Sequence, residues 1–204
     1  MSQNEKYPSE VLKEAVEAIS SLPGVGGRSA LRLALHLLGQ PRENVLHFSE
    51  AIGHLATDVH YCRQCNMVCD SELCPICSDP KRDRTTICVV ENVRDVMSIE
   101  ATGKYNGVYH VLGGIISPIN GVAPSDLDIR GLVERVRGGA VEVILALSGD
   151  VEGETTAFYI YRQIEDTGVK VTTLARGLGF GDNLEYADAL TLGRSISDRQ
   201  IFKP

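Results

Sequence analysis

Five of the six cysteines in this 204-residue chain lie close together, between residues 62 and 77. Cys62 and Cys65 form one C-x-x-C pair, and Cys74 and Cys77 form a second, with eight residues between the pairs. Two such pairs can place four thiolates around one tetrahedral Zn²⁺ ion, and four thiolates leave no open position for catalysis. The loop between them is too short and polar to fold on an apolar core, so the metal would supply the folding energy. The spacing therefore predicts a structural zinc site at these four cysteines.

The alternative for these thiols is a pair of disulfides or a redox centre. The first residues of the chain show no apolar run behind a basic stretch, and no window approaches the roughly 18 apolar residues of a membrane span. We therefore expect no signal peptide, no membrane segment and a cytoplasmic location, where thiols stay reduced. That location favours zinc. Cys69 belongs to neither pair and is expected not to bind the metal, and Cys88, in the apolar run TICVVE, is expected to be a small core residue.

The residues before the cysteines have the pattern of three helices. Ser9 is a suitable N-cap for a first helix, which ends at the breaker sequence LPGVG. A second helix is expected over residues 28–38, and a third over residues 43–57 with Pro41 near its start.

The turn between the first two helices has the features of a phosphate-binding hairpin. Gly24 and Gly26 permit a tight turn that exposes backbone amides beside a helix N-terminus, where the helix dipole favours anions. Arg28 and Arg32 are four residues apart and so share one face of the second helix. The pattern predicts a helix-hairpin-helix that grips the DNA backbone without reading its sequence. A plain helical turn with solvated arginines remains the alternative, whereas a P-loop is excluded because its lysine and its preceding strand are missing.

Charge is distributed unevenly along the chain. The formal net charge is −7, yet residues 1–57 carry five basic and six acidic side chains, whereas residues 87–204 carry eleven basic and sixteen acidic ones. Any basic surface is therefore expected near the N-terminus, despite the acidic average.

From residue 86 onward, strand patterns alternate with helix patterns. Strands are expected over residues 86–91, 107–114, 140–148 and 169–175, and helices over residues 92–103, 128–138 and 152–168. This alternation predicts a mostly parallel sheet, in which ligands bind at the C-terminal ends of the strands.

Carboxylates collect at those strand ends. Glu91 closes the first strand, and Asp150, Glu152 and Glu154 follow the third. Acids at neighbouring strand ends can share a Mg²⁺ ion through oxygen ligands. A solvated acidic loop at a helix N-terminus is the alternative, and it accounts for Glu152 and Glu154 more easily than for Glu91.

Two glycine-rich stretches have no regular periodicity. Residues 111–127, VLGGIISPINGVAPSDL, form a long loop of the kind that is often functional or faces a partner. Gly177, Gly179 and Gly181 do not match G-x-G-x-x-G, so they give little support to a dinucleotide site.

The order of these parts resembles the bacterial RecR family of recombination mediators. The resemblance runs from LPGVGGRSALRLA to TLGRSI, and its most specific pieces are the four-cysteine spacing and VLGGIISPINGVAP. It implies a multi-domain α+β chain with four parts. These are a helix-hairpin-helix DNA-binding domain (residues 1–57), a four-cysteine zinc finger (58–80), an α/β Toprim domain (81–175) and a C-terminal segment (176–204) that carries a Walker B-like motif and takes part in oligomerisation.

The resemblance also implies a function without catalysis. Catalytic Toprim proteins follow the strand-end Glu with a D-x-D motif; here Glu91 matches the first acid, but Ser148 stands at the first Asp position and Asp150 at the second. A missing carboxylate should weaken Mg²⁺ binding and leave phosphoryl transfer poorly supported. The family implies a nucleoid-associated, tetrameric ring that clamps DNA and acts with RecO, and in some settings RecF, to load RecA on single strands.

The C-terminal segment LEYADALTL is similar to the Walker B-like motif of the family, but no Walker A sequence accompanies it, so no ATP hydrolysis is expected. Phe180 replaces a more common proline, which affects the expected loop shape only. Two other functions stay open. One is a Mg²⁺-dependent Toprim nuclease or primase-like enzyme that uses Glu91, Asp150 and Glu154; the other is a protein-interaction scaffold that reaches DNA only through partners.

Overall fold

The computed structural model describes residues 7–175, 177–179, 181, 183–199 and 201. The chain divides into two compact units, Met1–Val59 and His60–Pro204. Phe180, whose effect on the local loop was predicted from the sequence, lies outside the described residues. Among the described residues, no helix is both long and apolar enough to cross a membrane.

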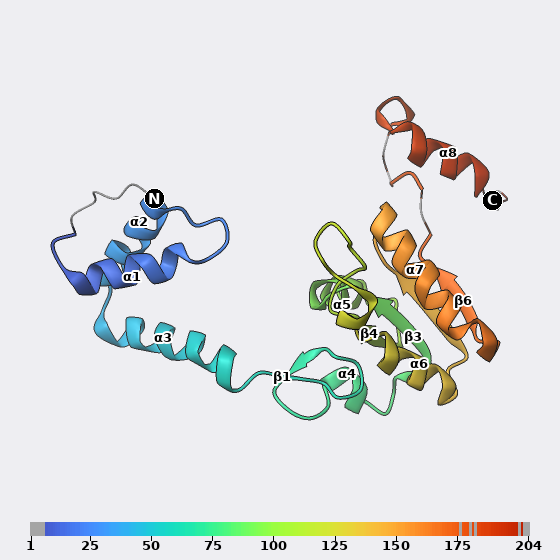
Figure 1. Ribbon diagram of the computed structural model, residues 1–204, viewed down its shortest axis with the longest axis horizontal. Helices are drawn as coiled ribbons and strands as arrows, with labels where there is room; N and C mark the ends of the chain where they lie inside the picture. Colours follow the sequence, from blue (N-terminus) through green and yellow to red (C-terminus); the bar gives the residue numbers. More distant parts are fainter. Residues whose placement is uncertain (1–6, 176, 180, 182, 200, 202–204) are drawn as a thin grey trace. The chain divides into compact units, whose positions relative to one another are not determined.

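The described part of the first unit contains three helices, which are labelled in Figure 1. They are α1 (Glu10–Ser20), α2 (Gly27–Leu38) and α3 (Arg42–Thr57). Ser9 caps α1 as expected, because its hydroxyl accepts a hydrogen bond from the Leu12 amide at 3.4 Å. Helices α1 and α2 pack against each other over Val16, Ala30 and Ala34, whose small side chains let the two backbones approach. Every residue of α3 is described, and none of them is buried.

The second unit begins with a small module that contains the cysteines. Two short antiparallel strands, β1 (His60–Tyr61) and β2 (Val68–Cys69), are followed by the single-turn helix α4 (Pro75–Ser78). The module has little apolar material of its own: Met67, Leu73 and Ile76 pack around the cysteine side chains.

A four-stranded sheet follows, and all of its strands are parallel. Its order is β4 (Gly107–Val111), β3 (Asp83–Val90), β5 (Glu142–Ala146) and β6 (Lys170–Thr173). The predicted α/β unit with a mostly parallel sheet is thus confirmed. Strand β3 begins three residues earlier than its apolar pattern suggested, and Glu91 lies just beyond its end.

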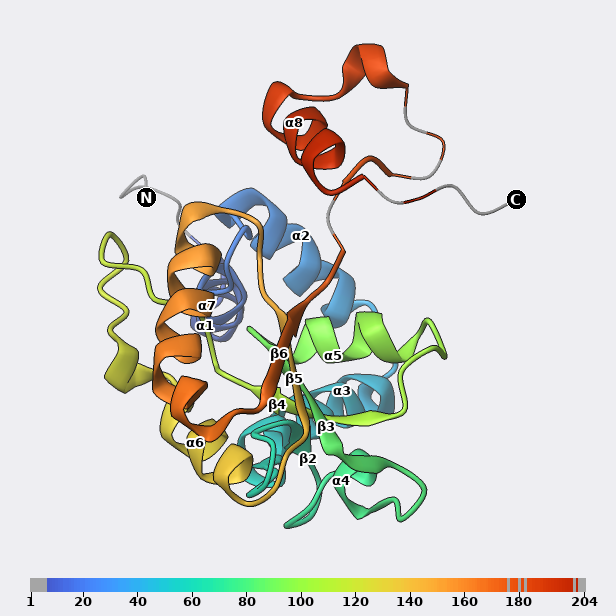
Figure 2. The same ribbon diagram turned by 90° about the vertical axis from the view of Figure 1, so that its right-hand side faces the viewer.

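Three helices cover the two faces of this sheet. Helices α6 (Ile129–Arg137) and α7 (Val151–Ile164) lie on one face and α5 (Val93–Glu100) on the other (Figure 2). Asn92 caps α5 through a reciprocal capping box with Asp95, which explains why the helix begins where the sequence predicted. Single-turn 3-10 helices occur at residues 124–126 and 165–167.

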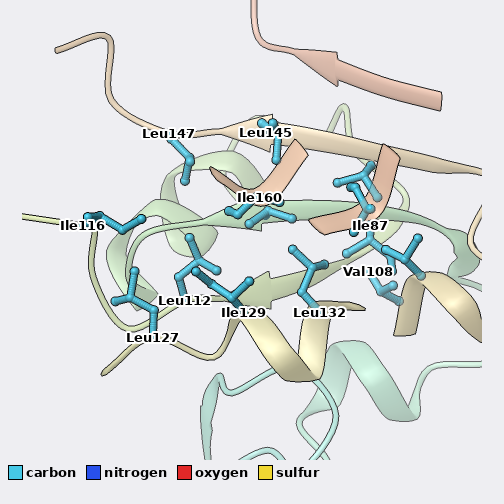
Figure 3. Close-up of a cluster of buried hydrophobic side chains, with 14 residues drawn as sticks. Ile87, Val108, Leu112, Ile116, Leu127, Ile129, Leu132, Leu145, Leu147 and Ile160 are labelled. Atoms are coloured by element: carbon cyan, nitrogen blue, oxygen red, sulfur yellow. The ribbon is translucent and has the colours of Figure 1, made fainter. Parts of the chain in front are cut away.

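The main core lies between the sheet and the α6–α7 face (Figure 3). Ile87 of β3, Val108 of β4 and Leu145 of β5 meet Leu132 of α6 and Ile160 of α7 there. A second cluster on the α5 face joins Val96 of α5 to Cys88 and Tyr109 of the sheet, and Met67 and Ile76 of the cysteine module pack against it. The cysteine module is therefore part of the same packed body as the sheet.

The chain continues from β6 into a C-terminal segment with a 3-10 turn (Leu184–Tyr186) and helix α8 (Ala189–Ser197). The sequence pattern had not predicted α8. Asp188 caps this helix, accepting a hydrogen bond from the Thr191 amide at 2.9 Å. Arg194 of α8 forms an ion pair with Glu154 of α7 at 3.3 Å.

Candidate metal centre and nucleic-acid interface

The two C-x-x-C pairs converge on one point. The sulfur atoms of Cys62, Cys65, Cys74 and Cys77 all lie within 4.8 Å of one another, and all four residues are buried. Zn–S bonds of about 2.3 Å in a tetrahedron would separate neighbouring sulfurs by roughly 3.8 Å. The Cys65 and Cys74 sulfurs are 3.5 Å apart. The donor set and its size therefore fit a four-coordinate zinc ion.

Local backbone geometry shapes the first pair. Asn66 follows Cys65 with φ of 61°, in the left-handed region that asparagine tolerates better than most residues. The backbone amide of Asn66 donates to the Cys62 carbonyl at 2.8 Å, which closes the turn. In the second pair, the Cys77 amide donates to the Cys74 sulfur at 3.4 Å, so backbone donors already point at a ligand atom.

The thiols do not ionise equally without a metal. Burial acts to raise the pKa of Cys62, but backbone hydrogen bonds from Cys74, Gln64 and Cys65 outweigh it and lower that pKa to about 7. Burial raises the pKa of Cys74 to about 11, and the hydrogen bond with Cys77 together with burial raises that of Cys65 further. Four thiolates this close repel one another, so a divalent cation would displace the remaining protons.

The module is attached to the edge of the sheet. The Val111 amide of β4 donates to the Cys65 carbonyl at 2.8 Å, and the Asn66 side-chain amide donates to the Val111 carbonyl at 3.1 Å. Because β4 is an edge strand, these bonds cover polar groups that would otherwise be open to another chain.

The two remaining cysteines lie outside the cluster. Cys69 ends β2, is buried, and donates from its sulfur to the Ser71 carbonyl at 2.8 Å. Cys88 is buried within β3, and burial raises the pKa of its thiol to about 12. Such a thiol behaves as a small apolar side chain.

The acidic residues at the strand ends are arranged around Ser148. The Ser148 amide donates to the Glu91 carboxylate at 2.5 Å, and its hydroxyl donates to Asp150 at 3.0 Å. Asp150 also caps α7, accepting from the Gly153 amide at 2.8 Å. The structure thus brings Glu91 and Asp150 to one serine.

The other two acids of this group turn elsewhere. Glu152 accepts a hydrogen bond from the Ser117 hydroxyl at 2.6 Å, which ties it to the long loop after β4. Glu154 faces Arg194 of α8. Within the described ranges, the four cysteines are the only group of three or more side chains placed to hold a metal ion. A magnesium site at the acidic residues stays a prediction.

The α1–α2 turn presents its backbone to solvent. Gly24 has φ of 80°, a conformation that favours glycine, and an added Cβ at Gly24 or Gly26 would meet nothing within 4 Å. Gly26 is the N-cap of α2 and offers no side chain to bond the first amides of the helix. Arg28 and Arg32 are both exposed on this helix. Uncapped amides at a helix N-terminus and nearby arginines favour anions, and a contact with phosphate here stays a prediction.

Comparison with protein families accounts for almost all of this architecture. The matched models are the helix-hairpin-helix of RecR (residues 12–56), the four-cysteine zinc finger domain of RecR (59–79), the Toprim domain (85–175) and the C-terminal part of RecR (177–200).

Similar curated proteins agree with these family matches. The chain is 56% identical over 200 residues to the Recombination protein RecR of Bacteroides thetaiotaomicron, covering 98% of both chains. The identity is 54% to that of Porphyromonas gingivalis (97% of this chain, 96% of the relative) and 51% to that of Flavobacterium johnsoniae (97% of each). The chain belongs to the RecR family. The expected resemblance is therefore confirmed, and the match to a four-cysteine zinc finger supports a structural zinc ion at the cysteine cluster.

Several contacts within this RecR-family fold could not be read from the sequence. Ser117 and Arg194 bind predicted acidic residues from 35 and 40 positions away, and no spacing pattern connects them. His110 is fully buried in β4, and Arg135 of α6 bonds to it at 3.2 Å. The only hint for this pair was a histidine inside an otherwise apolar strand.

Proposed function

We propose that this chain is a non-enzymatic DNA-binding recombination mediator. The observation that carries the proposal is the α1–α2 hairpin, which exposes uncapped amides beside Arg28 and Arg32 in a member of the RecR family. Gly24, Gly26, Arg28 and Arg32 are its proposed phosphate contacts. Backbone amides and arginines recognise phosphates without reading bases, so single and double strands of any sequence should bind.

In this proposal, assembly of several copies of the chain supplies the DNA affinity that one hairpin lacks. Two arginines and a few amides neutralise only a handful of phosphates, which gives weak affinity at physiological salt. A homotetrameric ring would present several hairpins to one DNA molecule and raise the effective concentration of each contact. In this proposal the ring acts with RecO, and in some settings with RecF, to help load RecA on single-stranded DNA at the bacterial nucleoid. The four parts at residues 1–57, 58–80, 81–175 and 176–204 would serve DNA binding, metal-dependent folding, partner binding and oligomerisation.

The alternative is a Mg²⁺-dependent Toprim nuclease or primase-like enzyme. Its support is the pair of carboxylates, Glu91 and Asp150, at neighbouring strand ends. Against it stands Ser148, whose amide and hydroxyl already occupy these carboxylates as hydrogen-bond donors. A nuclease or primase activity that requires Mg²⁺ and disappears in Glu91→Gln would favour the enzyme and contradict the mediator.

The mediator is tested with the double variant Arg28→Ala/Arg32→Ala. DNA affinity of the full chain should fall at least tenfold, and the slope of log affinity against log salt should flatten by about two for each hairpin engaged. Arg42→Ala, which removes an exposed arginine at the start of α3, is the matched control. Light scattering should show one oligomer size for all three proteins.

The same titration separates the mediator from a scaffold that reaches DNA only through partners. The purified chain should bind DNA by itself, with an affinity that falls as salt rises. If the purified wild type does not bind, or if the double variant binds as tightly as the wild type, the proposed hairpin contact is wrong.

A further inference from the structure

Arg135 of α6 reaches toward the junction of the sheet and the cysteine module. One of its guanidinium nitrogens donates to the Tyr109 carbonyl of β4 at 2.6 Å and approaches the His110 Nδ1 atom at 3.2 Å. Two residues along the same strand, the Val111 amide holds the Cys65 carbonyl. The guanidinium is thus fixed on the strand that also holds a predicted metal ligand.

His110 accepts from this arginine and does not balance its charge. A guanidinium has no lone pair to accept a hydrogen bond, so the His110 Nδ1 atom must be unprotonated. The proton then lies on Nε2, which donates to the Asp128 carbonyl at 2.6 Å. Burial, together with the positive charge of Arg135, lowers the pKa of His110 to about 4, so this ring is neutral at physiological pH.

The described residues supply no carboxylate partner for Arg135. Of the described arginines, Arg82 is paired with Glu100, Arg137 with Asp166 and Arg162 with Glu165, but no carboxylate oxygen lies within 4.0 Å of the Arg135 guanidinium. Arg135 is only partly exposed, on a cleft of about 440 Å³ that Asp128 and Glu134 also line, although neither carboxylate forms an ion pair with it. Its hydrogen bonds go to neutral groups, and a partly buried cation without an anionic partner is costly, so its position requires an explanation.

The cysteine module lies beside it: Arg135 lines one cleft with Gln64 and Leu73, which are the chain neighbours of Cys65 and Cys74. In agreement with this proximity, burial lowers the pKa of the Arg135 guanidinium, whereas the thiolates of Cys77, Cys65 and Cys62 act to raise it. Four thiolates and one Zn²⁺ ion carry a combined charge of −2 in a site that buries all four ligands.

We propose that Arg135 is the counter-charge of the metal centre. Its guanidinium lies at the module–sheet junction and offsets part of the negative charge that zinc leaves on the four thiolates. Metal binding and the packing of α6 beside the module would then be coupled. The negative zinc–thiolate centre stabilises the Arg135 cation, and the cation stabilises the thiolates. Arg135 positions and stabilises the site without being a ligand.

The experiment measures zinc retention in the full chain under reducing conditions. Wild type, Arg135→Gln and Arg135→Lys are titrated with a chromogenic zinc chelator at neutral pH, and zinc release is then followed as the pH is lowered. Arg137→Gln is the matched control, since Arg137 lies two residues away on the same helix but pairs with Asp166 at the surface.

We expect Arg135→Gln to weaken zinc affinity about 10- to 100-fold, the range seen when groups that support metal ligands are removed. Its zinc should also be released at a higher pH than in wild type, because protons compete better for thiolates that have lost a nearby cation. Arg135→Lys should restore most of the affinity, and Arg137→Gln should match wild type.

Two results would overturn the proposal. One is that Arg135→Gln releases its zinc at the same chelator concentration and the same pH as wild type. The other is an Arg135→Lys protein that loses zinc more than tenfold more easily than wild type, which would show that the shape and hydrogen bonds of arginine matter and its charge does not. The lysine variant decides the matter alone if Arg135→Gln fails to fold.

Discussion

The two units of this chain differ in how much apolar surface they bury. In the second unit, 14 buried side chains form one cluster between the sheet and helices α6 and α7. In the first unit, the cluster of buried side chains consists of Val16, Ala30 and Ala34. Helix α3 is described in full and has no buried residue. Its apolar side chains Phe48, Ile52 and Leu55 are 51%, 52% and 63% exposed.

Helix α3 accounts for much of the apolar surface that the first unit leaves exposed. Phe48, Ile52 and Leu55 are spaced four and three residues apart, so they form one apolar stripe along α3. Exposed apolar stripes of this kind usually mark an interface. The second unit has its core and its cysteine cluster, whereas the first leaves an apolar stripe exposed. A ring of several copies, as proposed for this chain, would supply a partner for this stripe.

The largest effect should come from breaking the metal centre. Cys74→Ser removes one of four thiolates, and structural zinc is worth on the order of 10 kcal/mol to a small domain. We expect the variant to lose its zinc and much of its soluble yield. Hydrogen exchange should show opening of β1, β2 and the outer edge of β4, while α1 and α2 keep their protection.

Cys69→Ser is the control, because Cys69 lies outside the group of four thiols and its own thiol donates to the Ser71 carbonyl. Metal analysis should find one zinc ion per chain in this variant and in wild type. Equal loss of zinc from Cys69→Ser would mean that the four ligands are assigned wrongly. Equal loss of protection in α1 and α2 would mean that the units do not differ as described.

A pair of apolar substitutions compares the two units directly. Ile160 is fully buried in the main core, so Ile160→Ala should lower the free energy of unfolding of the second unit by about 2–5 kcal/mol. Phe48→Ser with Ile52→Ser, on exposed α3, should change it by less than about 1 kcal/mol. The double variant should instead form smaller oligomers and bind DNA more weakly, even though Arg28 and Arg32 are intact.

Urea unfolding and light scattering on the same samples measure both effects. A double variant of wild-type size would show that the α3 stripe is not part of an assembly interface. A destabilisation as large as that of Ile160→Ala would show that α3 is packed in the isolated chain after all.

Much of the second unit was predictable because its signals are local. A continuous apolar run located β3, strand-like stretches located β4, β5 and β6, and Asn92 located the start of α5. The polar beginning of β3 was missed because Asp83, Arg84 and Thr85 carry no apolar pattern; Asp83 pairs with Gly107 of β4, and the Thr85 carbonyl accepts a hydrogen bond from the Val141 amide. Helix α8 was not predicted, although it is as long as α6 and its N-cap, Asp188, is a local signal.

The candidate sites also differ in whether they depend on local sequence spacing or on the fold. The cysteine cluster depends on spacings within 16 residues, so the sequence alone located it. Partners of the acidic residues depend on the fold: Ser117 reaches Glu152, and Ser148 bridges Glu91 and Asp150 across two neighbouring strand ends. The pairing of Arg135 with β4 likewise exists only once α6 has packed on the sheet.

A smaller effect should appear as the pH is lowered. The folded-state pKa of His110 is about 4, below its ordinary value near 6.5, so the unfolded state binds the proton more readily. Its contribution to stability is therefore complete above pH 6.5 and is lost as the pH falls toward 4, by on the order of 3 kcal/mol. His110→Gln should flatten the stability of the second unit across this range relative to wild type. An unchanged pH profile would mean that His110 does not govern it.

The smallest effect concerns two glycines of the first unit, and it separates backbone conformation from phosphate binding. Gly24 has φ of 80°, so Gly24→Ala should destabilise the hairpin by about 1 kcal/mol. Gly26 has φ of −80° and ψ of 162°, which alanine adopts without strain, so Gly26→Ala should change stability by less than about 0.5 kcal/mol. Hydrogen exchange of α1 and α2 in the full chain measures this difference.

Both methyl groups would project from the surface beside the first amides of α2, so both variants should bind DNA several-fold more weakly. If Gly26→Ala keeps wild-type stability and wild-type DNA affinity, phosphates do not approach these amides, and Arg28 and Arg32 alone must account for the contact.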